Sequence, residues 1–430
     1  MVPPRRASVV PIRCARVVAA IGRCDPAVNP LHLSHFTATT CLGRGLTANL
    51  DALREERSGL APCRLETVNL DTCVGEVAGV DDERLAPAFS DFDCRNNRLA
   101  QLSLAQDDFA AAVDAARARY GSDRIGVFVG TSTSGILQTE LAYRRRDPVT
   151  RALPDGFHYA MTQNSFSAAD FVRRTLRLGG PAVAVSTACS SGAKVFGSAA
   201  RMIEAGLIDA AVVGGVDSLC LTTLYGFSSL QLTSTRPCRP FDRSRNGISI
   251  GEAAAFVIIE RPPAAPSPDA ILLLGIGESS DAHHMSSPHP EGLGARMAME
   301  QALASAGRAP EAIDYINLHG TGTLSNDLAE GRAVLSLFGG ATRCSSTKGA
   351  VGHTLGAAGA VGAVISAIAL CHGFMPAGVN TQELDPALPL AYLLHKGARA
   401  PSLVLSNSFG FGGTNCSLVL GRGDSLMEGT

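Results

Sequence analysis

A cysteine lies where a predicted strand gives way to a predicted helix, a position suited to a nucleophile. Cys189 stands in the run Ala-Val-Ala-Val-Ser-Thr-Ala-Cys-Ser-Ser-Gly, in which residues 182–185 are expected to form a short buried strand. Residues 192–206 are expected to form a helix, and the N–H groups at its start favour negative charge. We therefore expect a lowered pKa and a larger thiolate fraction for Cys189. The small neighbouring residues leave room for a substrate, as on a nucleophile elbow.

Three further segments hold residues that could assist such a thiol. His319 ends a buried strand and is followed by Gly-Thr-Gly-Thr, while Lys348 and His353 bracket a glycine turn before a helix. The segment 407–415, Asn-Ser-Phe-Gly-Phe-Gly-Gly-Thr-Asn, is a glycine-rich loop between strands. A single buried Cys or His is more often structural, as is a glycine turn. Together, however, the segments offer a nucleophile, two N–H donors, a charge partner and a flexible gate.

Strands and helices alternate along both halves of the chain, which predicts an α/β fold with parallel sheets. Reactive residues that follow buried strands place the site between two similar halves, at the carboxyl ends of the strands. The proline-rich run 261–268 is the best linker, so we predict halves at 31–265 (nucleophile) and 266–425 (His, Lys and gating loop). The expected strands are 31–40, 124–129, 182–185, 210–213, 253–259, 270–276, 315–318, 403–406 and 417–420. The expected helices are 46–56, 99–118, 167–177, 192–206, 294–306, 328–338 and 355–371, with a polar insertion around the arginines at 144–146.

Composition narrows the possible classes of protein. The chain has 430 residues, of which 46% are hydrophobic and 18% charged, so a large core is possible. A net charge of −2 gives no global electrostatic reason to expect nucleic acid or membrane binding. The 12 cysteines show no metal-ligand spacing, which indicates reduced residues of a cytoplasmic protein.

Two segments resemble targeting or membrane sequences only in part. Residues 1–30 are arginine-rich at their start, but they hold no clean signal core or cleavage site, so we expect a disordered N-terminal extension. The uncharged stretch between Lys348 and Glu383 is interrupted by glycine and proline. A buried core helix over 355–371 is the better interpretation than a membrane span.

The four reactive segments, taken in order, resemble the β-ketoacyl-acyl carrier protein synthases of fatty-acid and type II polyketide synthesis. The matching segments are Thr187-Ala-Cys-Ser-Ser, His319-Gly-Thr-Gly-Thr, Lys348 with Gly352-His353, and 407–415, supported by 239–247 and 279–288. The resemblance covers about residues 31–420. It implies a thiolase-like fold of two similar βαβ-rich halves packed as α-β-α-β-α layers, a dimer, and no metal or organic cofactor.

The resemblance also implies a mechanism, the decarboxylative condensation of an acyl thioester with malonyl-acyl carrier protein. Cys189 would take the acyl group from phosphopantetheine, with the oxyanion held by the backbone N–H groups of Cys189 and Phe411. His319 and His353 would stabilise the enolate as neutral N–H donors. Lys348 would pair with Glu330 and orient the histidine loops.

Other residues receive supporting roles from the same resemblance. Phe411 matches the gate that turns on acylation, between glycines that supply a hinge. The remaining assignments are Asp327 near the Lys348–Glu330 pair, Thr321 and Thr323 on the pantetheine arm, Ser286 at the substrate, Thr133 at the far end of the acyl pocket, and Arg95 and Arg98 as docking sites for the acidic carrier protein. A solvated helix face explains Arg95 and Arg98 equally well, and the arginines at 144–146 are a further docking candidate.

Two departures from the family pattern bear on this assignment. Fatty-acid elongating enzymes commonly carry Pro and Gly where Leu324 and Asn326 stand here, which leans towards polyketide-type relatives. They also carry Glu nine residues after the second His, where this chain has Gly362, so any cation site associated with that carboxylate is in doubt.

Several functions of the same fold compete with elongation. A non-catalytic chain-length partner would lack Cys189, and a thiolase would need a second reactive Cys, for which Cys416 is the candidate. The initiating synthases use Asn where His353 stands. Fatty-acid elongation and a dedicated type II polyketide or aryl polyene pathway both remain open. A homodimer and a heterodimer with an inactive homologue also remain open.

Overall fold

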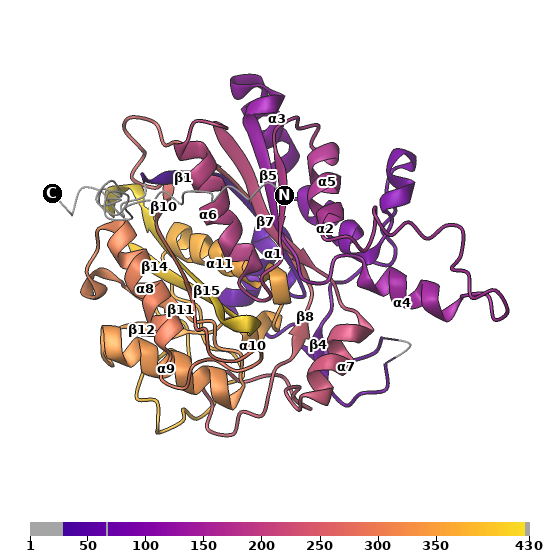
Figure 1. Ribbon diagram of the computed structural model, residues 1–430. Helices are drawn as coiled ribbons and strands as arrows, with labels where there is room; N and C mark the ends of the chain where they lie inside the picture. The colour runs from indigo at the N-terminus through magenta and orange to yellow at the C-terminus, as the bar shows by residue number, and fades with distance from the viewer. Residues whose placement is uncertain (1–28, 66–67, 426–430) are drawn as a thin grey trace, which may run out of the picture.

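One mixed β-sheet runs through the computed structural model, which describes residues 29–65 and 68–425 (Figure 1). In the described chain the sheet has 12 strands in the order β13-β12-β11-β14-β15-β10-β1-β9-β7-β5-β6, with β2 paired to β1. Its strands are β1 (Leu31–Thr40), β2 (Gly43–Arg44), β5 (Ile125–Gly130), β6 (Ala182–Val185), β7 (Ala210–Asp217), β9 (Ala253–Glu260), β10 (Ile271–Ser280), β11 (Tyr315–Asn317), β12 (Arg343–Ser345), β13 (Ala391–Tyr392), β14 (Leu403–Gly410) and β15 (Thr414–Arg422). A small second sheet joins β3 (Ala61–Pro62), β4 (Cys73–Gly75) and β8 (Ile250–Gly251).

The large sheet is parallel only towards its two ends, so the expectation of parallel sheets was half right. Strands β5, β6 and β7 pair in parallel, as do β11, β12, β13 and β14. The central strands pair antiparallel with their neighbours. Strand β1 is antiparallel to both β9 and β10, β9 is antiparallel to β7, β10 is antiparallel to β15, and β14 and β15 form a hairpin. A short loop can join antiparallel strands, whereas parallel strands need a crossover helix.

Two long helices lie in the middle of the molecule (Figure 1), whereas the short helix α10 (Lys348–Val351) is buried beside them. The central pair, α6 (Ser191–Glu204) and α11 (Ala358–His372), contacts one another and shares one hydrophobic cluster with β1, β7 and β9. The others are α1 (Gly45–Arg54), α2 (Arg95–Leu104), α3 (Phe109–Tyr120), α4 (Ile136–Arg144), α5 (Phe166–Thr175), α7 (Leu221–Ser229), α8 (Leu293–Ala306), α9 (Leu324–Phe338) and α10 (Lys348–Val351). A second cluster lies under α2, α3 and α5, and a third under α8 and α9. The result is the α/β layering expected of the fold class.

The uncharged stretch after His353 forms the core helix that its glycines and alanines predict. Among the described residues one helix, Leu355–His372, is long and apolar enough to cross a membrane, and 78% of it is buried inside the protein. The small residues of this helix allow the close packing that a central layer requires.

Two expected elements differ from those observed. The helix expected at 99–118 is broken into α2 and α3, because the residues Asp107 and Asp108 between them take left-handed φ values of 53°. The Asp107 carboxylate there accepts the backbone N–H of Leu46 at 3.0 Å, which ties the break to α1. Strand β6 is half-buried rather than buried, because it lies at the edge of the sheet.

The predicted division into halves stays a prediction. Its boundary falls in the segment between β9 and β10, but both of these strands hydrogen-bond to β1, so a single sheet crosses the boundary. Most of the predicted N-terminal extension, residues 1–28, lies outside the described residues.

Candidate active site

Cys189 occupies a tight turn between β6 and α6. The turn requires a left-handed Ala188 with φ of 53°, a conformation that non-glycine residues rarely adopt. Hydroxyl groups hold it, since Ser191 Oγ donates to the Ala188 carbonyl at 2.6 Å and accepts the Thr187 N–H at 2.8 Å. The thiol therefore projects from a strained strand-to-helix junction.

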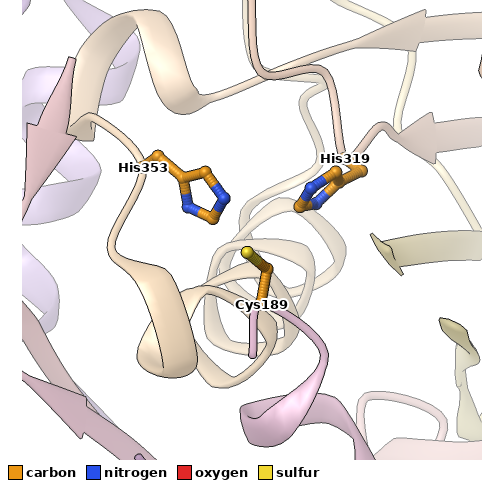
Figure 2. A group of neighbouring side chains, drawn as sticks. All are labelled: Cys189, His319 and His353. Carbon is orange, nitrogen blue, oxygen red and sulfur yellow. The ribbon is translucent and has the colours of Figure 1, made fainter. Parts of the chain in front are cut away.

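The thiol of Cys189 faces two imidazoles across one cavity, as Figure 2 shows. His319 comes from the loop after β11 and His353 from the turn after α10. One ligand atom from each of the three residues lies within 4.8 Å of the other two, and the two rings are 5.3 Å apart between centroids. The fold thus joins segments from both halves of the sequence in one site. The same cavity is also lined by Ser286, Thr321, Thr323, Phe227 and Phe411, among others.

Each histidine is held as a neutral N–H donor. Burial lowers the pKa of His319 and of His353 well below the usual value, and the charge of Lys348 acts in the same direction. The Nδ1 atom of His319 lies 3.4 Å from the Lys348 ammonium, and Nδ1 of His353 accepts the Leu355 N–H at 3.2 Å. Because both Nδ1 atoms face donors, each ring carries its proton on Nε2.

This hydrogen bonding fits a metal ion poorly, although the spacing of Cys189, His319 and His353 would suit a tetrahedral ion. A histidine that ligates a metal donates its other ring N–H to a carbonyl or carboxylate. Here the second nitrogen of each ring meets a donor instead. The donor set is arranged for hydrogen bonding to a substrate rather than for ligation.

The pKa of Cys189 moves in the direction opposite to the sequence-based expectation. Burial raises it to about 11, although the Lys348 charge and the backbone N–H groups of Phe411 and Cys189 act to lower it. The expectation of a lowered pKa was wrong, because the loss of hydration at a 5% exposed side chain outweighs these favourable charges and dipoles. Cys189 is therefore a thiol at neutral pH, and its proton must leave when the sulfur acts as a nucleophile.

Lys348 and Glu330 do not form the direct pair that the resemblance implied. The Glu330 carboxylate accepts the backbone N–H groups of His319 and Gly320, each at 2.7 Å, and the Asn407 side-chain N–H at 3.2 Å. The Lys348 ammonium instead donates to the His319 carbonyl. The two charged groups therefore fix the same loop from its two sides, and both orient His319.

Asp327 supports the neighbouring glycine turn. Its buried carboxylate accepts the N–H groups of Thr321 at 3.0 Å and Phe241 at 2.8 Å. The Thr321 and Thr323 hydroxyls lie 2.9 Å apart on the cavity wall, and Ser286 lines the same cavity. Each hydroxyl also has a partner within the chain, since Thr323 Oγ1 accepts the Asn326 N–H at 3.4 Å and Ser286 Oγ lies 3.3 Å from His284 Nδ1.

Phe411 forms part of a loop that closes over the cavity. Its ring packs against Phe227, which lines the same cavity from α7, with the ring centroids 5.5 Å apart. Sequence reasoning missed Phe227, which carries only the weak signal of an aromatic residue after a glycine. The two rings together narrow the cavity in front of the thiol.

Two glycines follow Phe411 and give its loop an unusual backbone. Gly412 and Gly413 have φ values of 82° and 78°, in the region that glycine adopts readily. A second loop holds this one at two points, since the Gly412 N–H donates to the Met285 carbonyl and the Asp281 N–H donates to the Gly413 carbonyl, each at 2.8 Å. The glycines expected to supply a hinge are therefore also the points at which the two loops are joined.

The structure contradicts the assignment of Arg95 to carrier-protein docking. Its side chain is 4% exposed and pairs with Glu252 and Asp81, each at 2.7 Å. Arg98 is 17% exposed and binds Asp93 through two nitrogens, each at 2.5 Å. Both guanidinium groups are already engaged by carboxylates of the same chain, so neither offers an unpaired charge to a partner.

Thr133 and Gly362 also lie away from the cavity. Thr133 is buried, and its hydroxyl donates to Asp217 at 2.9 Å, so its place in an acyl pocket stays a prediction. Gly362 borders a separate small pocket with Asn317, Lys348 and Asn407, among others. No carboxylate is among the described residues that line that pocket, and an ammonium is, so these residues do not fit a cation.

Comparisons with known proteins agree with the geometry of the site. Residues 36–265 match the family described as beta-ketoacyl synthase, N-terminal domain, and residues 271–382 match beta-ketoacyl synthase, C-terminal domain. A 3-oxoacyl-[acyl-carrier-protein] synthase 2 from Coxiella burnetii is 36% identical over 315 residues, which cover 70% of this chain and 75% of the relative. The Vibrio harveyi protein of the same name is 31% identical over 406 residues, covering 88% of this chain and 95% of the relative.

Solved structures resemble the whole described fold. The ketosynthase ApeO in complex with its chain length factor ApeC, from Xenorhabdus doucetiae, has a TM-score of 0.83 and 39% identity, covering 92% of this chain and 98% of that one. The ishigamide ketosynthase/chain length factor has a TM-score of 0.81 and 28% identity, covering 92% of this chain and 100% of that one.

Proposed function

Because this chain belongs to the beta-ketoacyl synthase family, we propose that it joins an enzyme-bound acyl group to malonyl-acyl carrier protein with loss of CO₂. The product is a β-ketoacyl-acyl carrier protein, as in fatty-acid or polyketide elongation. One observation carries the proposal: the Cys189 thiol faces two imidazoles whose Nδ1 atoms both accept hydrogen bonds. That arrangement combines a nucleophile with two neutral N–H donors.

The first step transfers the acyl group to Cys189. Sulfur attacks the thioester carbonyl of the acyl carrier, the phosphopantetheine thiolate leaves, and the thiol proton passes to it. The backbone N–H groups of Cys189 and Phe411 both reach the sulfur and would bind the oxyanion that develops beside it. The cavity provides Thr321, Thr323 and Ser286 for the polar pantetheine arm.

The second step makes the carbon–carbon bond. Malonyl thioester loses CO₂, and the Nε2–H groups of His319 and His353 hydrogen-bond the enolate oxygen that forms. The enolate carbon attacks the acyl carbonyl on Cys189, the bond to sulfur breaks, and the released thiolate takes up a proton. Neutral donors suit this task because they need no proton exchange with solvent.

Intact-mass spectrometry of the acylated protein tests the nucleophile. Incubation with an acyl carrier protein should add one acyl group to the wild type and none to Cys189→Ala, while Cys416→Ala should still be acylated. An adduct that persists on Cys189→Ala would refute the assignment. Formation of β-ketoacyl product from malonyl-acyl carrier protein, followed by the same method, tests the complete reaction.

We propose a partner subunit at the edge of the sheet formed by β6. Among the described residues this strand pairs with β5 alone, and its four residues are half-buried. Such an edge is suited to pairing with a second chain. A second copy would make a homodimer, and an inactive homologue would make a heterodimer.

A dedicated ketosynthase with a chain-length factor is a second candidate function, favoured by the 39% identity to a chain of the complex between the ketosynthase ApeO and its chain length factor ApeC. Co-expression with a neighbouring ketosynthase-like gene that lacks the cysteine distinguishes the two. Native mass spectrometry should then show a mixed dimer that elongates, whereas an active homodimer favours ordinary fatty-acid elongation.

The acidic carrier protein needs a basic surface near the cavity. With Arg95 and Arg98 engaged, the exposed arginines at 144–146, at the end of α4, are the remaining sequence-based candidate. Helix α4 contacts α7, the helix that carries Phe227, so the arginines lie on a segment joined to the cavity wall. We place the reaction in the cytoplasm, because all ten cysteines of the described residues are free and a reducing compartment keeps them so.

A further inference from the structure

A fully buried carboxylate lies behind the active site and belongs to none of the assigned roles. Asp217 ends β7, is 0% exposed, and has no ion-pair partner within 4 Å among the described residues. It does not line the cavity. Buried carboxylates are costly unless hydrogen bonds satisfy them, so its partners show what it holds in place.

The partners of Asp217 come from two loops. From the loop after β5 it accepts the Thr131 hydroxyl at 2.7 Å and the N–H groups of Ser132 at 2.8 Å and Thr133 at 2.9 Å. From the turn after His353 it accepts the Gly356 N–H at 2.6 Å. The carboxylate is therefore the point at which the two loops are joined.

The turn that Asp217 holds also orients His353. Within it Leu355 has a left-handed φ of 52°, which a leucine adopts only when surrounding contacts impose it. The Leu355 N–H donates to His353 Nδ1 at 3.2 Å, and the next N–H along the chain, that of Gly356, is the one bound by Asp217. The bond to Gly356 thus keeps the Leu355 N–H directed at the imidazole.

The packing around this bond leaves no room for the turn to shift. A Cβ added to Gly356 would lie 2.7 Å from the Ser132 backbone nitrogen and 2.8 Å from Asp217 Oδ2. A Cβ on Gly215, two residues before Asp217, would lie 2.8 Å from the Ala357 Cα. Strand β7 and the turn are in direct backbone contact, so a change at the carboxylate is transmitted to the turn.

We propose that Asp217 is a positioning residue that fixes His353 as an Nε2–H donor by holding the turn at Gly356. The inference rests on the proposed function for the step that it affects, decarboxylation of the malonyl thioester. Acyl transfer to Cys189 relies on backbone N–H groups outside this turn. Through the turn, Asp217 therefore acts on one half of the reaction. Burial is the main cause of the raised pKa of the Cys189 thiol, and the charge of Asp217 also reaches that group and helps to raise its pKa.

The first test compares the two half-reactions in Asp217→Asn. The amide can accept through its oxygen, but its NH₂ must face one of the N–H donors, so the turn loses part of its support. CO₂ release from malonyl-acyl carrier protein, measured with Cys189→Gln as the common background, should fall by about 10-fold to 100-fold, as when a hydrogen bond that orients a functional histidine is lost. Acylation of Cys189, measured with the thiol present, should not fall by more than about threefold, because loss of the Asp217 charge acts to lower the pKa of the thiol.

Glu260→Gln is the matched control. Glu260 is also a buried carboxylate at the end of a neighbouring strand, away from the cavity; it accepts the Tyr120 hydroxyl at 2.8 Å and, unlike Asp217, pairs with an arginine, Arg119, at 2.9 Å. This variant should leave both half-reactions unchanged. If Asp217→Asn lowers acylation and decarboxylation equally, in step with its melting temperature, Asp217 is merely structural and the proposal fails.

The second test reads the imidazole directly and does not depend on turnover. In protein labelled with ¹⁵N-histidine, the NMR signals of His353, assigned by their loss in His353→Asn, should show the proton on Nε2. In Asp217→Asn a share of the Nδ1–H form should appear. A wild-type His353 protonated on Nδ1 overturns the inference even if Asp217→Asn does not fold. Absence of any condensation by the wild type refutes the proposed function instead, and leaves this measurement intact.

Discussion

His319 and His353 face the same thiol, yet the groups behind them differ in charge. The His319 loop is held by two side chains: the Lys348 ammonium donates to the His319 carbonyl, and the Glu330 carboxylate accepts the His319 N–H. Behind His353 stands a backbone N–H in a turn that Asp217 anchors. Both arrangements leave Nε2 as the donor, one through a charged side chain and the other through backbone geometry.

The same protonation state, a neutral imidazole with its proton on Nε2, can therefore be imposed in two ways. The interaction of an imidazole with a charge acts over several ångströms and changes little when the loop moves slightly. A hydrogen bond from the backbone, in contrast, is lost unless the turn stays in place. The His319 loop should therefore be sensitive to loss of charge, and the His353 turn to loss of anchoring.

Removal of either imidazole should have the largest effect. His319→Ala and His353→Ala should each lower CO₂ release from malonyl-acyl carrier protein by about 10²–10³, the usual cost of losing one donor to a developing oxyanion. Acylation of Cys189, followed by intact mass, serves as the control for folding. If one of the two variants kept full activity, the two loops would not share the task.

Loss of the Lys348 charge beside His319 should cause the second largest fall in decarboxylation. Lys348→Met removes the donor at Nδ1, so His319 can take up the Nδ1–H form and decarboxylation should fall by about 10-fold to 100-fold. The ¹⁵N signals of His353 should stay unchanged, because its Nδ1 partner is the Leu355 N–H. Lys194→Met is a suitable control, since Lys194 faces Glu278 at 3.5 Å and does not line the cavity. If Lys348→Met changed the ¹⁵N signals of His353 as much as those of His319, the two loops would not be held in different ways.

The pH dependence of decarboxylation should be weak. Burial lowers the pKa of both imidazoles well below 6.5, so as the pH falls from about 8 to about 6 both remain neutral and keep their Nε2 protons as donors. The two histidines should therefore contribute no change to the rate of a Cys189→Gln background over this range. Burial raises the pKa of Glu330 to about 7, so protonation of this carboxyl, which accepts the His319 N–H, should account for any modest fall in rate towards pH 6. A histidine of ordinary pKa would lose about three quarters of its neutral form by about pH 6. A fall in rate that persists in a Glu330→Gln variant would show that one histidine loop is open to water.

A single hydroxyl behind the His353 turn should have the smallest effect. Thr131→Val deletes one hydrogen bond to Asp217 and keeps the shape of the side chain. We expect the free energy of unfolding, measured with urea, to fall by about 1–2 kcal/mol. Decarboxylation should change by less than about threefold, because the Gly356 N–H keeps its acceptor. If Thr131→Val lowered decarboxylation as much as is expected for Asp217→Asn, the loop after β5, rather than the bond to Gly356, would be responsible for orienting His353.

The candidate reactive residues were predicted from four segments taken together and from their resemblance to a known family, because each local signal alone is more often structural. Cys189, His319 and His353 each lie beside glycine or other small residues at the end of a short element, which is the part of the pattern that neighbours along the chain supply. The strands and most helices were predictable from such neighbours, because periodicity and glycine are local properties.

Contacts between distant segments could not be predicted in this way. Nothing in the sequence indicates that Arg95 reaches Glu252, 157 positions away, and so is unable to dock a partner. Nor does anything indicate that burial outweighs the favourable dipoles at Cys189 and raises its pKa to about 11. Both outcomes depend on how much water the folded chain excludes, a property of packing rather than of neighbours.

The central place of β1 has a consequence for how the chain is made. Residues 31–40 leave the ribosome early, but their ladder partners are residues 254–260 and 272–273, more than 200 positions later. At about 5–20 residues per second, this strand waits at least roughly 10 s with only its last two residues paired, to β2. Such long-range pairing makes folding slow and exposes the nascent chain to aggregation. The central strand of the sheet therefore gains from protection during synthesis.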